Sequence, residues 1–216
     1  MNEENGRIIE FKRPEPERPP AQPAAVNLPP ITKIIIAGLI AIFAVDWLIG
    51  ELTGLRWIAS YLAFYGLAAD PLAIAQLFTY ALIHNDLAHL AMNIVGIAVL
   101  GKVLEPAIGA GKMFMLLAIG SAAGAIVQIG IGGPTILIGI SAGVGALYGV
   151  ALPPAWRGYF GRLDRAVIIL ALFFLATSLF GLVTGFLGNI AHAAHIGGLL
   201  AGLLLSAKML PLRAGP

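Results

Sequence analysis

The sequence contains no cysteine and few charged residues. Among its 216 residues, 59% are hydrophobic and 11% are charged, whereas a soluble domain is about half apolar and a quarter charged. Without cysteine, the chain forms no disulfide and has neither a cysteine nucleophile nor a cysteine-ligated metal. The scarcity of charge indicates a protein of the lipid bilayer rather than a soluble domain.

Two long runs carry no charge at all. No Asp, Glu, Lys or Arg lies between Lys112 and Arg157, or between Arg165 and Lys208. Each run exceeds the ~20 apolar residues that cross a bilayer, so each is predicted to hold two spans. The sequence therefore predicts an all-α, polytopic membrane protein with a six-transmembrane-helix bundle.

Three regions follow from this pattern. Residues 1–30 are expected to form a disordered, proline-rich cytoplasmic tail and lack the apolar core of a cleavable signal peptide. Residues 31–208 form the membrane domain, and residues 209–216 form a short cytoplasmic tail. The six predicted spans are 31–50, 86–104, 112–131, 141–153, 165–186 and 189–208.

Local signals set some of the predicted boundaries. The aromatic-rich segment 51–80 suits interfacial helices rather than a span. Asp86 is predicted to be the N-cap of the second span, and Pro153 and Pro154 are predicted to stop the fourth. With a cytoplasmic N-terminus, twelve of the thirteen basic residues fall inside and only Arg56 falls outside. The positive-inside rule therefore predicts that both termini are cytoplasmic.

One serine stands alone in the uncharged stretch "GISAGVGALYG", residues 139–149. By helical rise, Ser141 lies roughly 18 Å from the proline stop, inside a hydrocarbon core about 30 Å thick. His195, counted back from Lys208, and His89 and Asn93, counted back from the charged end of the second span, reach a similar depth. Four polar side chains from three spans are therefore predicted to lie at one level.

Glycine stripes predict how two of these side chains meet. Gly145 and Gly149 continue the helical face of Ser141, and Gly198 and Gly202 continue that of His195. Small residues at this spacing allow helix backbones to approach closely in membranes. The stripes are therefore predicted to be helix-packing faces that bring the imidazole to the hydroxyl.

This combination suits nucleophilic catalysis. A histidine takes the proton of the serine and later returns it to the leaving group. His89 and Asn93, together with the backbone N–H of Ser141 at a helix N-terminus, are predicted to stabilise the tetrahedral oxyanion. No acid lies at this level, so the predicted catalytic group is a Ser141–His195 dyad.

Other polar residues have simpler interpretations. His84, near the outer end of the second span, is either a water-binding or gating residue or a structural one, and His192 is expected to be structural. The segment from Gly139 to Gly143 matches the G-x-S-x-G nucleophile elbow, with Asp164 in the position of an acid. We reject that interpretation because no strand precedes the serine and Asp164 falls on the cytoplasmic side.

Three stretches resemble motifs of the rhomboid family of intramembrane serine proteases. "HNDLAHLAMN" (84–93) resembles the family's H-x4-H-x3-N pattern, "GISAGVGALYG" its G-x-S-G motif, and "AHIGGLLAG" (194–202) its A-H-x-x-G motif. The resemblance extends over about residues 31–208. It implies hydrolysis of peptide bonds in or near transmembrane segments of membrane-protein substrates, without metal, cofactor or nucleic acid. It also implies a multi-pass location in the bacterial inner membrane.

The family pattern is not matched everywhere. Ala142 replaces the glycine that usually follows the nucleophile. Gly145 stands where many members carry an aromatic residue that stacks on the catalytic histidine, so His195 is expected to be less supported. The resemblance also implies that residues 183–190 and the upper part of the fifth span form a lateral gate for substrate.

The sequence is also compatible with two other functions. An inactive rhomboid-like protein that binds membrane clients would tolerate the loss of Ser141 and His195, whereas a protease requires both. A small transporter would bind solute at the polar cluster, but transporters of that kind show inverted repeats or broken helices. No convincing repeat is present in this sequence.

Overall fold

The computed structural model describes residues 27–67, 71–133, 135–186 and 190–210. Within these ranges the chain is helical, and its only extended pairing is one antiparallel bridge between Phe64 and Leu137. The prediction of an all-α fold is confirmed. Most of the two predicted tails, 1–30 and 209–216, and part of the predicted gate segment 183–190 lie outside the described residues.

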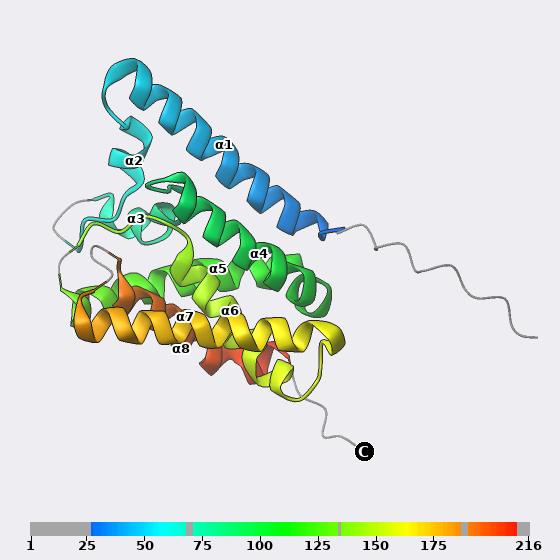
Figure 1. Cartoon of the computed structure of the whole chain (residues 1–216). Helices are drawn as coiled ribbons and strands as arrows, with labels where there is room; N and C mark the ends of the chain where they lie inside the picture. The colour runs from blue at the N-terminus through cyan, green and yellow to red at the C-terminus, as the bar shows by residue number, and fades with distance from the viewer. Residues whose placement is uncertain (1–26, 68–70, 134, 187–189, 211–216) are drawn as a thin grey trace, which may run out of the picture.

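Six long helices and several short ones make up the described chain (Figure 1). The long helices are α1 (Pro30–Thr53), α4 (Leu87–Ile108), α5 (Ala110–Val127), α6 (Ser141–Trp156), α7 (Asp164–Thr184) and α8 (His192–Met209). The segment predicted to hold interfacial helices contains α2 (Trp57–Leu62), α3 (Ala73–Thr79) and the 3-10 turn η1 (Tyr80–Leu82). A π-helical turn, η2 (Gln128–Gly132), extends α5, and a 3-10 turn, η3 (Gly161–Leu163), precedes α7.

Local chemistry explains several helix ends. Pro30 occupies the first turn of α1, where its missing N–H leaves no intrahelical bond unmade, and Gly54 ends α1 in the left-handed region at φ 74°. The predicted N-cap at Asp86 is confirmed, because its carboxylate accepts the backbone N–H of His89 at 2.8 Å. That bond satisfies one of the N–H groups that the start of a helix leaves without an intrahelical partner.

The prediction that Pro153 and Pro154 stop the fourth helix is wrong. Helix α6 continues through both prolines to Trp156. A proline leaves the carbonyl four residues earlier without its helical donor, which for Pro154 is the carbonyl of Val150. Ser206 of α8 donates its hydroxyl to that carbonyl at 3.0 Å, so the neighbouring helix replaces one of the two bonds that the prolines remove.

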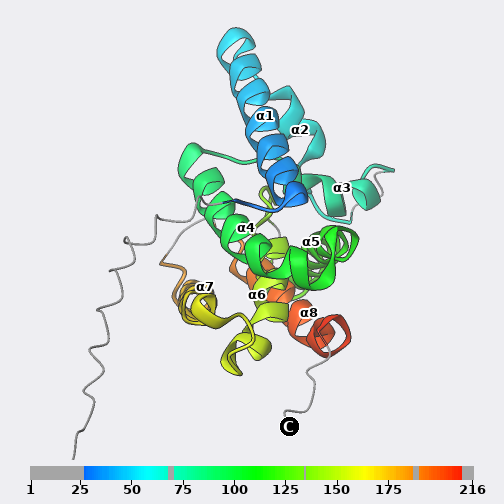
Figure 2. The same ribbon diagram turned by 90° about the vertical axis from the view of Figure 1, so that its right-hand side faces the viewer.

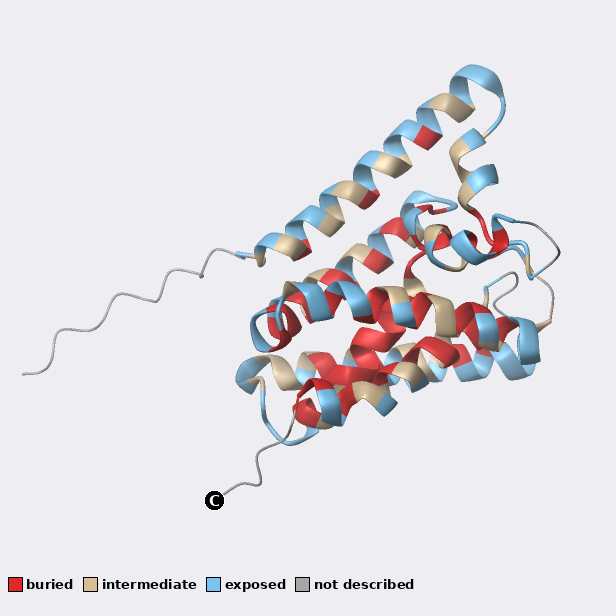
Figure 3. Ribbon diagram, turned by 180° about the vertical axis from the view of Figure 1, so that it is seen from behind, coloured by how far each residue is buried: buried red, intermediate tan, exposed pale blue. Residues whose placement is uncertain are grey.

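Helix α6 lies at the centre of the bundle. It packs against α4, α5, α7 and α8, which surround it when the molecule is viewed end-on (Figure 2). Every residue from Ala142 to Ala151 is buried, whereas α1 packs on α4 at the edge and is largely exposed (Figure 3). A helix that is apolar on all sides is stable only when it is enclosed in this way. The central position of α6 places Ser141, its first residue, among its neighbours.

The helices are those of an integral membrane protein. Four helical segments are long and apolar enough to cross a bilayer: Pro30–Thr53, Leu87–Ile108, Ala110–Gly132 and Gly161–Thr184. Helix α6 has 16 residues, about 24 Å at 1.5 Å per residue, which is less than the ~30 Å hydrocarbon core.

Candidate active site

Ser141 and His195 are in direct contact. Ser141 is the first residue of α6, and His195 lies in the first turn of α8. The Nε2 atom of His195 is 2.9 Å from the Oγ atom of Ser141, a normal hydrogen-bond distance. The structure thus brings together the two residues that the sequence analysis paired.

The turn before Ser141 requires a glycine. Gly139 has φ +103°, and its backbone N–H donates to the carbonyl of Tyr80 at 2.9 Å. A Cβ atom at this position would meet the imidazole of His89, with Nε2 only 2.6 Å away. The absence of a side chain lets the turn lie directly on His89, which places that ring beside the start of α6.

The backbones of α6 and α8 touch at the predicted glycine stripes. Gly198 lies against the carbonyl of Ala142, and Gly202 lies against the carbonyl of Ala146. A Cβ atom on either glycine would be closer to that oxygen than real Cβ atoms approach. On the opposing helix, a Cβ on Gly149 would come within 2.6 Å of the backbone nitrogen of Leu203. These backbone contacts hold α8, and with it His195, against the start of α6.

Helix α7 supports His195 from its other side. The ring of Phe174 lies 4.9 Å from the imidazole, centroid to centroid, at an interplanar angle of 34°. The Oγ atom of Ser178 lies 3.2 Å from His195 Nδ1. The expectation that Gly145 leaves His195 less supported is therefore wrong. A Cβ on Gly145 would be 3.1 Å from Cε1 of Phe174, so the small residue provides the space in which an aromatic ring from α7 stacks on the histidine.

The other departure from the family pattern is also accommodated. The methyl group of Ala142 faces Gly124 of α5, where a Cβ would approach the Ala142 Cβ to 2.5 Å. Because residue 124 is a glycine, the extra methyl group has room between α5 and α6.

The predicted oxyanion groups lie on α4. Asn93 is buried, and its Nδ2 atom donates to the carbonyl of His89 at 3.1 Å. A side-chain amide has two N–H donors, so one of them remains for another acceptor. The rings of His84 and His89 are 5.1 Å apart, centroid to centroid. His84, His89 and Asn93 therefore lie one after another along α4 and the turn before it.

Two buried histidines stand out by the surroundings of their ring nitrogens. Among the described residues, neither nitrogen of His84 or of His192 has a hydrogen-bond partner. His84 is 1% exposed, and burial, followed by the nearby His89, lowers its pKa to about 4. His84 is therefore neutral at physiological pH, with one donor and one acceptor nitrogen. The ring of His192 lies 6.0 Å from that of His195.

Asp164 is not near the serine. Its Oδ1 atom accepts the backbone N–H of Phe160 at 2.8 Å at the start of α7. Fourteen residues of helix, roughly 21 Å, separate it from Ser178 on the same helix. Across the described ranges, no group of three His, Asp or Glu side chains is arranged to hold a metal ion.

Sequence reasoning missed three residues around His195. Phe174 and Ser178 are four residues apart, so they project from one face of α7, and that spacing is a usable signal. Gln128, in the π-helical turn, accepts the backbone N–H of Ala194 through its Oε1 atom at 3.2 Å. No spacing in the sequence indicates that contact, because it joins residues 66 positions apart.

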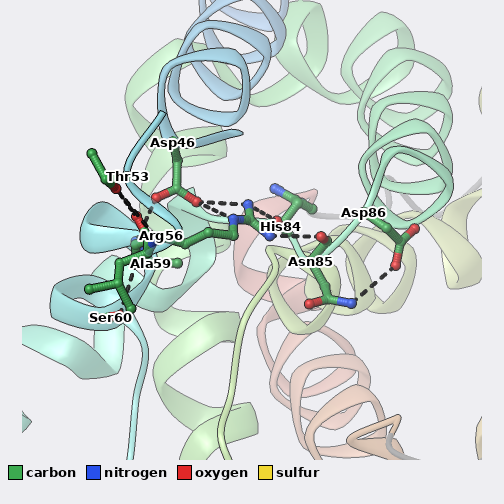
Figure 4. Close-up of polar contacts among 9 residues, drawn as sticks. Asp46, Thr53, Arg56, Ala59, Ser60, His84, Asn85 and Asp86 are labelled. Atoms are coloured by element: carbon green, nitrogen blue, oxygen red, sulfur yellow. Dashed lines mark hydrogen bonds and ion pairs between the residues drawn. The ribbon is translucent and has the colours of Figure 1, made fainter. Parts of the chain in front are cut away.

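A part-buried ion pair fixes the turn that precedes α4 (Figure 4). The carboxylate of Asp46 on α1 is 1% exposed, and its Oδ2 atom is 2.7 Å from the Arg56 guanidinium. Arg56 also donates to the carbonyls of His84 and Asn85, both at 2.8 Å. The guanidinium therefore joins α1 to the turn that carries His84.

We expect Arg56→Ala to destabilise the protein. Removing one partner of a buried pair costs about 3–5 kcal/mol, and because the Arg56 side chain is 30% exposed we expect about 3 kcal/mol. Arg56→Lys keeps the charge but not the planar fork that reaches two carbonyls, so it should restore only part of the stability. Denaturation of the purified proteins in detergent measures the free energy of unfolding of both variants. Arg157→Ala, at an exposed arginine, is the control, and equal stability of Arg56→Ala and this control would contradict the interpretation.

Known proteins resemble this chain in sequence. A family model described as "Rhomboid domain" matches residues 71–212. A protein named "Rhomboid protease GlpG" from Salmonella paratyphi A is 29% identical over 184 residues, which cover 82% of this chain and 62% of the relative. The protein of the same name from Pectobacterium atrosepticum is 29% identical over 179 residues, with the same shares covered. The chain thus spans about 62% of the length of these relatives.

Proposed function

The chain belongs to the rhomboid family, and from that premise we propose that it is an intramembrane serine protease. Its substrates are membrane proteins, and it hydrolyses peptide bonds in or near their transmembrane segments. The observation that carries this proposal is the 2.9 Å contact between Ser141 Oγ and His195 Nε2. The family relatives named as proteases support it.

In the proposed reaction, Ser141 Oγ is the nucleophile and His195 Nε2 is the general base. His195 Nε2 accepts the proton of the Ser141 hydroxyl while Oγ forms a bond to the substrate carbonyl carbon. The carbonyl oxygen then carries a negative charge, which the backbone N–H of Ser141 and the side chains of Asn93 and His89 stabilise. His195 returns the proton to the leaving amine, and a water molecule, activated by the same imidazole, hydrolyses the acyl-enzyme.

His84 has a separate role in this proposal. Buried polar atoms are nearly always hydrogen-bonded, and both ring nitrogens of His84 are without a partner among the described residues. A buried water typically makes about three hydrogen bonds to such groups. We therefore assign His84 to holding water beside His89 at the outer end of α4.

The membrane arrangement is also part of the proposal. We place α1, α4, α5, α6, α7 and α8 as six spans of the bacterial inner membrane, with both termini in the cytoplasm. In Figure 1, α1 begins, α4 ends, α6 ends and α7 begins on one side of the bundle, and the basic residues of these ends face the cytoplasm. Ser141, at the opposite end of a short helix, then lies below the outer surface of the bilayer.

A reporter assay tests the function. Purified protein is reconstituted in liposomes with a single-span reporter protein, and cleavage is followed by gel electrophoresis and mass spectrometry. We expect the wild type to cut at one or a few positions in or near the span, and Ser141→Ala not to cut. Binding of the reporter by both proteins, with cleavage by neither, would support an inactive client-binding protein instead.

We expect Asn93→Ala to lower kcat more than it changes KM. The free amide donor of Asn93 gains strength only as negative charge develops on the oxyanion, and loss of one such donor costs about 10²–10³ in kcat. His89→Ala should have the same direction of effect. Initial rates over a range of reporter concentrations separate the two constants. A rise in KM with kcat unchanged would assign these residues to substrate binding.

A further inference from the structure

We propose that Ser178 is a positioning residue that fixes which nitrogen of His195 carries the proton. The inference rests on the proposed function, because it concerns the base of that reaction. Ser178 lies on α7 and is 1% exposed. Its Oγ atom makes two contacts, one to the carbonyl of Phe174 at 2.7 Å and one to Nδ1 of His195 at 3.2 Å.

A count of protons sets the direction of both bonds. A serine hydroxyl has one proton to donate and two lone pairs that accept. A carbonyl oxygen can only accept, so the short bond to Phe174 takes the single proton of Ser178. Towards His195, the hydroxyl can then only accept, and Nδ1 must be the donor. A neutral imidazole carries one N–H, so Nε2 is left with a lone pair.

That lone pair faces the nucleophile. Nε2 is the atom that lies 2.9 Å from Ser141 Oγ, and it can receive the serine proton only when it carries none of its own. In the opposite tautomer, Nε2–H would donate to Ser141, and the histidine could not act as the general base. The tautomer of a histidine is set by the hydrogen bond of its other nitrogen. Ser178 makes that bond here.

The same contact also serves the charged state. After proton transfer, both ring nitrogens of His195 carry protons, and the lone pair of Ser178 still accepts from Nδ1. Phe174, one turn earlier on α7, fixes the plane of the ring by stacking at 4.9 Å. Both supports come from one face of α7, so the orientation of His195 depends on the position of that helix against α8.

Helix α7 offers a matched control at the adjacent residue. Thr177 also donates its hydroxyl to backbone carbonyls of α7, to Phe173 at 2.9 Å and to Phe174 at 3.1 Å. The Thr177→Ala variant therefore removes a hydroxyl that is bonded in the same way but does not bond His195. The Ser178→Ala variant removes the hydroxyl that bonds His195.

Kinetics give the first readout. We expect Ser178→Ala to lower kcat about fivefold, the factor that corresponds to the typical net strength of one hydrogen bond, with KM unchanged. Thr177→Ala should keep the wild-type kcat. A merely structural role of Ser178 predicts instead that Ser178→Ala loses thermal stability but keeps the wild-type kcat at a temperature where it is folded.

Histidine-labelled NMR gives a second readout that needs no turnover. With ¹⁵N in the imidazole rings and His195→Asn to assign the signals, the protonated nitrogen of His195 can be identified directly in detergent micelles. We expect Nδ1–H in the wild type and in Thr177→Ala, and a mixture of tautomers in Ser178→Ala. If the wild type cleaves no reporter but its tautomer still differs from that of Ser178→Ala, the proposed protease is overturned and the positioning role is kept. A tautomer that is the same in all three proteins would overturn the positioning role alone.

Discussion

Ser141→Ala and His195→Ala are each expected to abolish cleavage. In a soluble serine protease with the same two groups, loss of either costs on the order of 10⁶ in kcat, which would bring the reporter assay to its background. Because the nucleophile and the base act as a unit, the double variant should be no slower than either single variant. This non-additivity separates the dyad from two residues that contribute independently.

The stability of the two variants should differ. Ser141→Ala removes an oxygen whose side-chain bond is the one to His195, so its thermal unfolding should match the wild type. His195→Ala also removes a ring that stacks on Phe174, and the cavity left should lower the stability. Comparison with His195→Asn separates that loss from the chemistry. Ser121→Ala, at another buried serine of the membrane helices, is the control and should cleave normally. Turnover by Ser141→Ala at even a few per cent of the wild-type rate would exclude Ser141 as the nucleophile.

The long helices can be predicted from the sequence because they depend on local composition. Uncharged runs and the N-cap at Asp86 locate them to within a few residues. The prediction for the end of α6 fails for a physical reason that is not local. Pro154 leaves the Val150 carbonyl unpaired, and the residue that satisfies it, Ser206, is 56 positions away. A sequence pattern shows the lost donor but not its replacement.

Some contacts of the candidate site can likewise be predicted from the sequence, and others cannot. Ser141 and His195 can be paired from the sequence because helical rise places both at a similar depth and each is followed by a glycine stripe. The residues that support His195 cannot be predicted from the sequence, because they depend on which side chain fills the space beside Gly145. In the sequence, Gly145 indicates the loss of a stacking aromatic, whereas Phe174 of another helix occupies that space. Compensation between helices is a property of packing and has no spacing rule.

The contact between α6 and α8 leaves no room for a side chain at Gly198. Gly198→Val should lower activity and stability together, because one backbone contact supports both. A Cβ at this position would overlap the Ala142 carbonyl, and the carbonyl carbon is only 2.7 Å away. These are backbone atoms and cannot rotate aside, so the two helices must separate. Overpacking typically costs about 1–3 kcal/mol, and we expect the upper end of that range.

The expected loss of activity follows from the same displacement. A 1 Å misplacement of catalytic groups can cost about 10²-fold in rate, and Ala142 is the residue next to Ser141. Since the Cβ atom itself causes the overlap, Gly198→Ala should show most of the effect of valine. Cleavage rates and thermal unfolding in detergent measure the two consequences on the same preparations.

The choice of control decides whether this result is informative. Gly197, on a different face of α8, is unsuitable because a Cβ there would meet Val127 of α5 at 2.7 Å and the Ala123 carbonyl at 3.0 Å. Gly38, within α1, has no atom within 4 Å of the position that a Cβ would occupy, so Gly38→Val adds the same side chain in open space and should be near wild type. Gly197→Val should also be destabilised, because the Cβ of Val127 is fixed to its backbone and cannot rotate aside. Wild-type cleavage by Gly198→Val, or a larger loss in Gly38→Val, would show that the approach of α8 to Ala142 does not set the distance between His195 and Ser141.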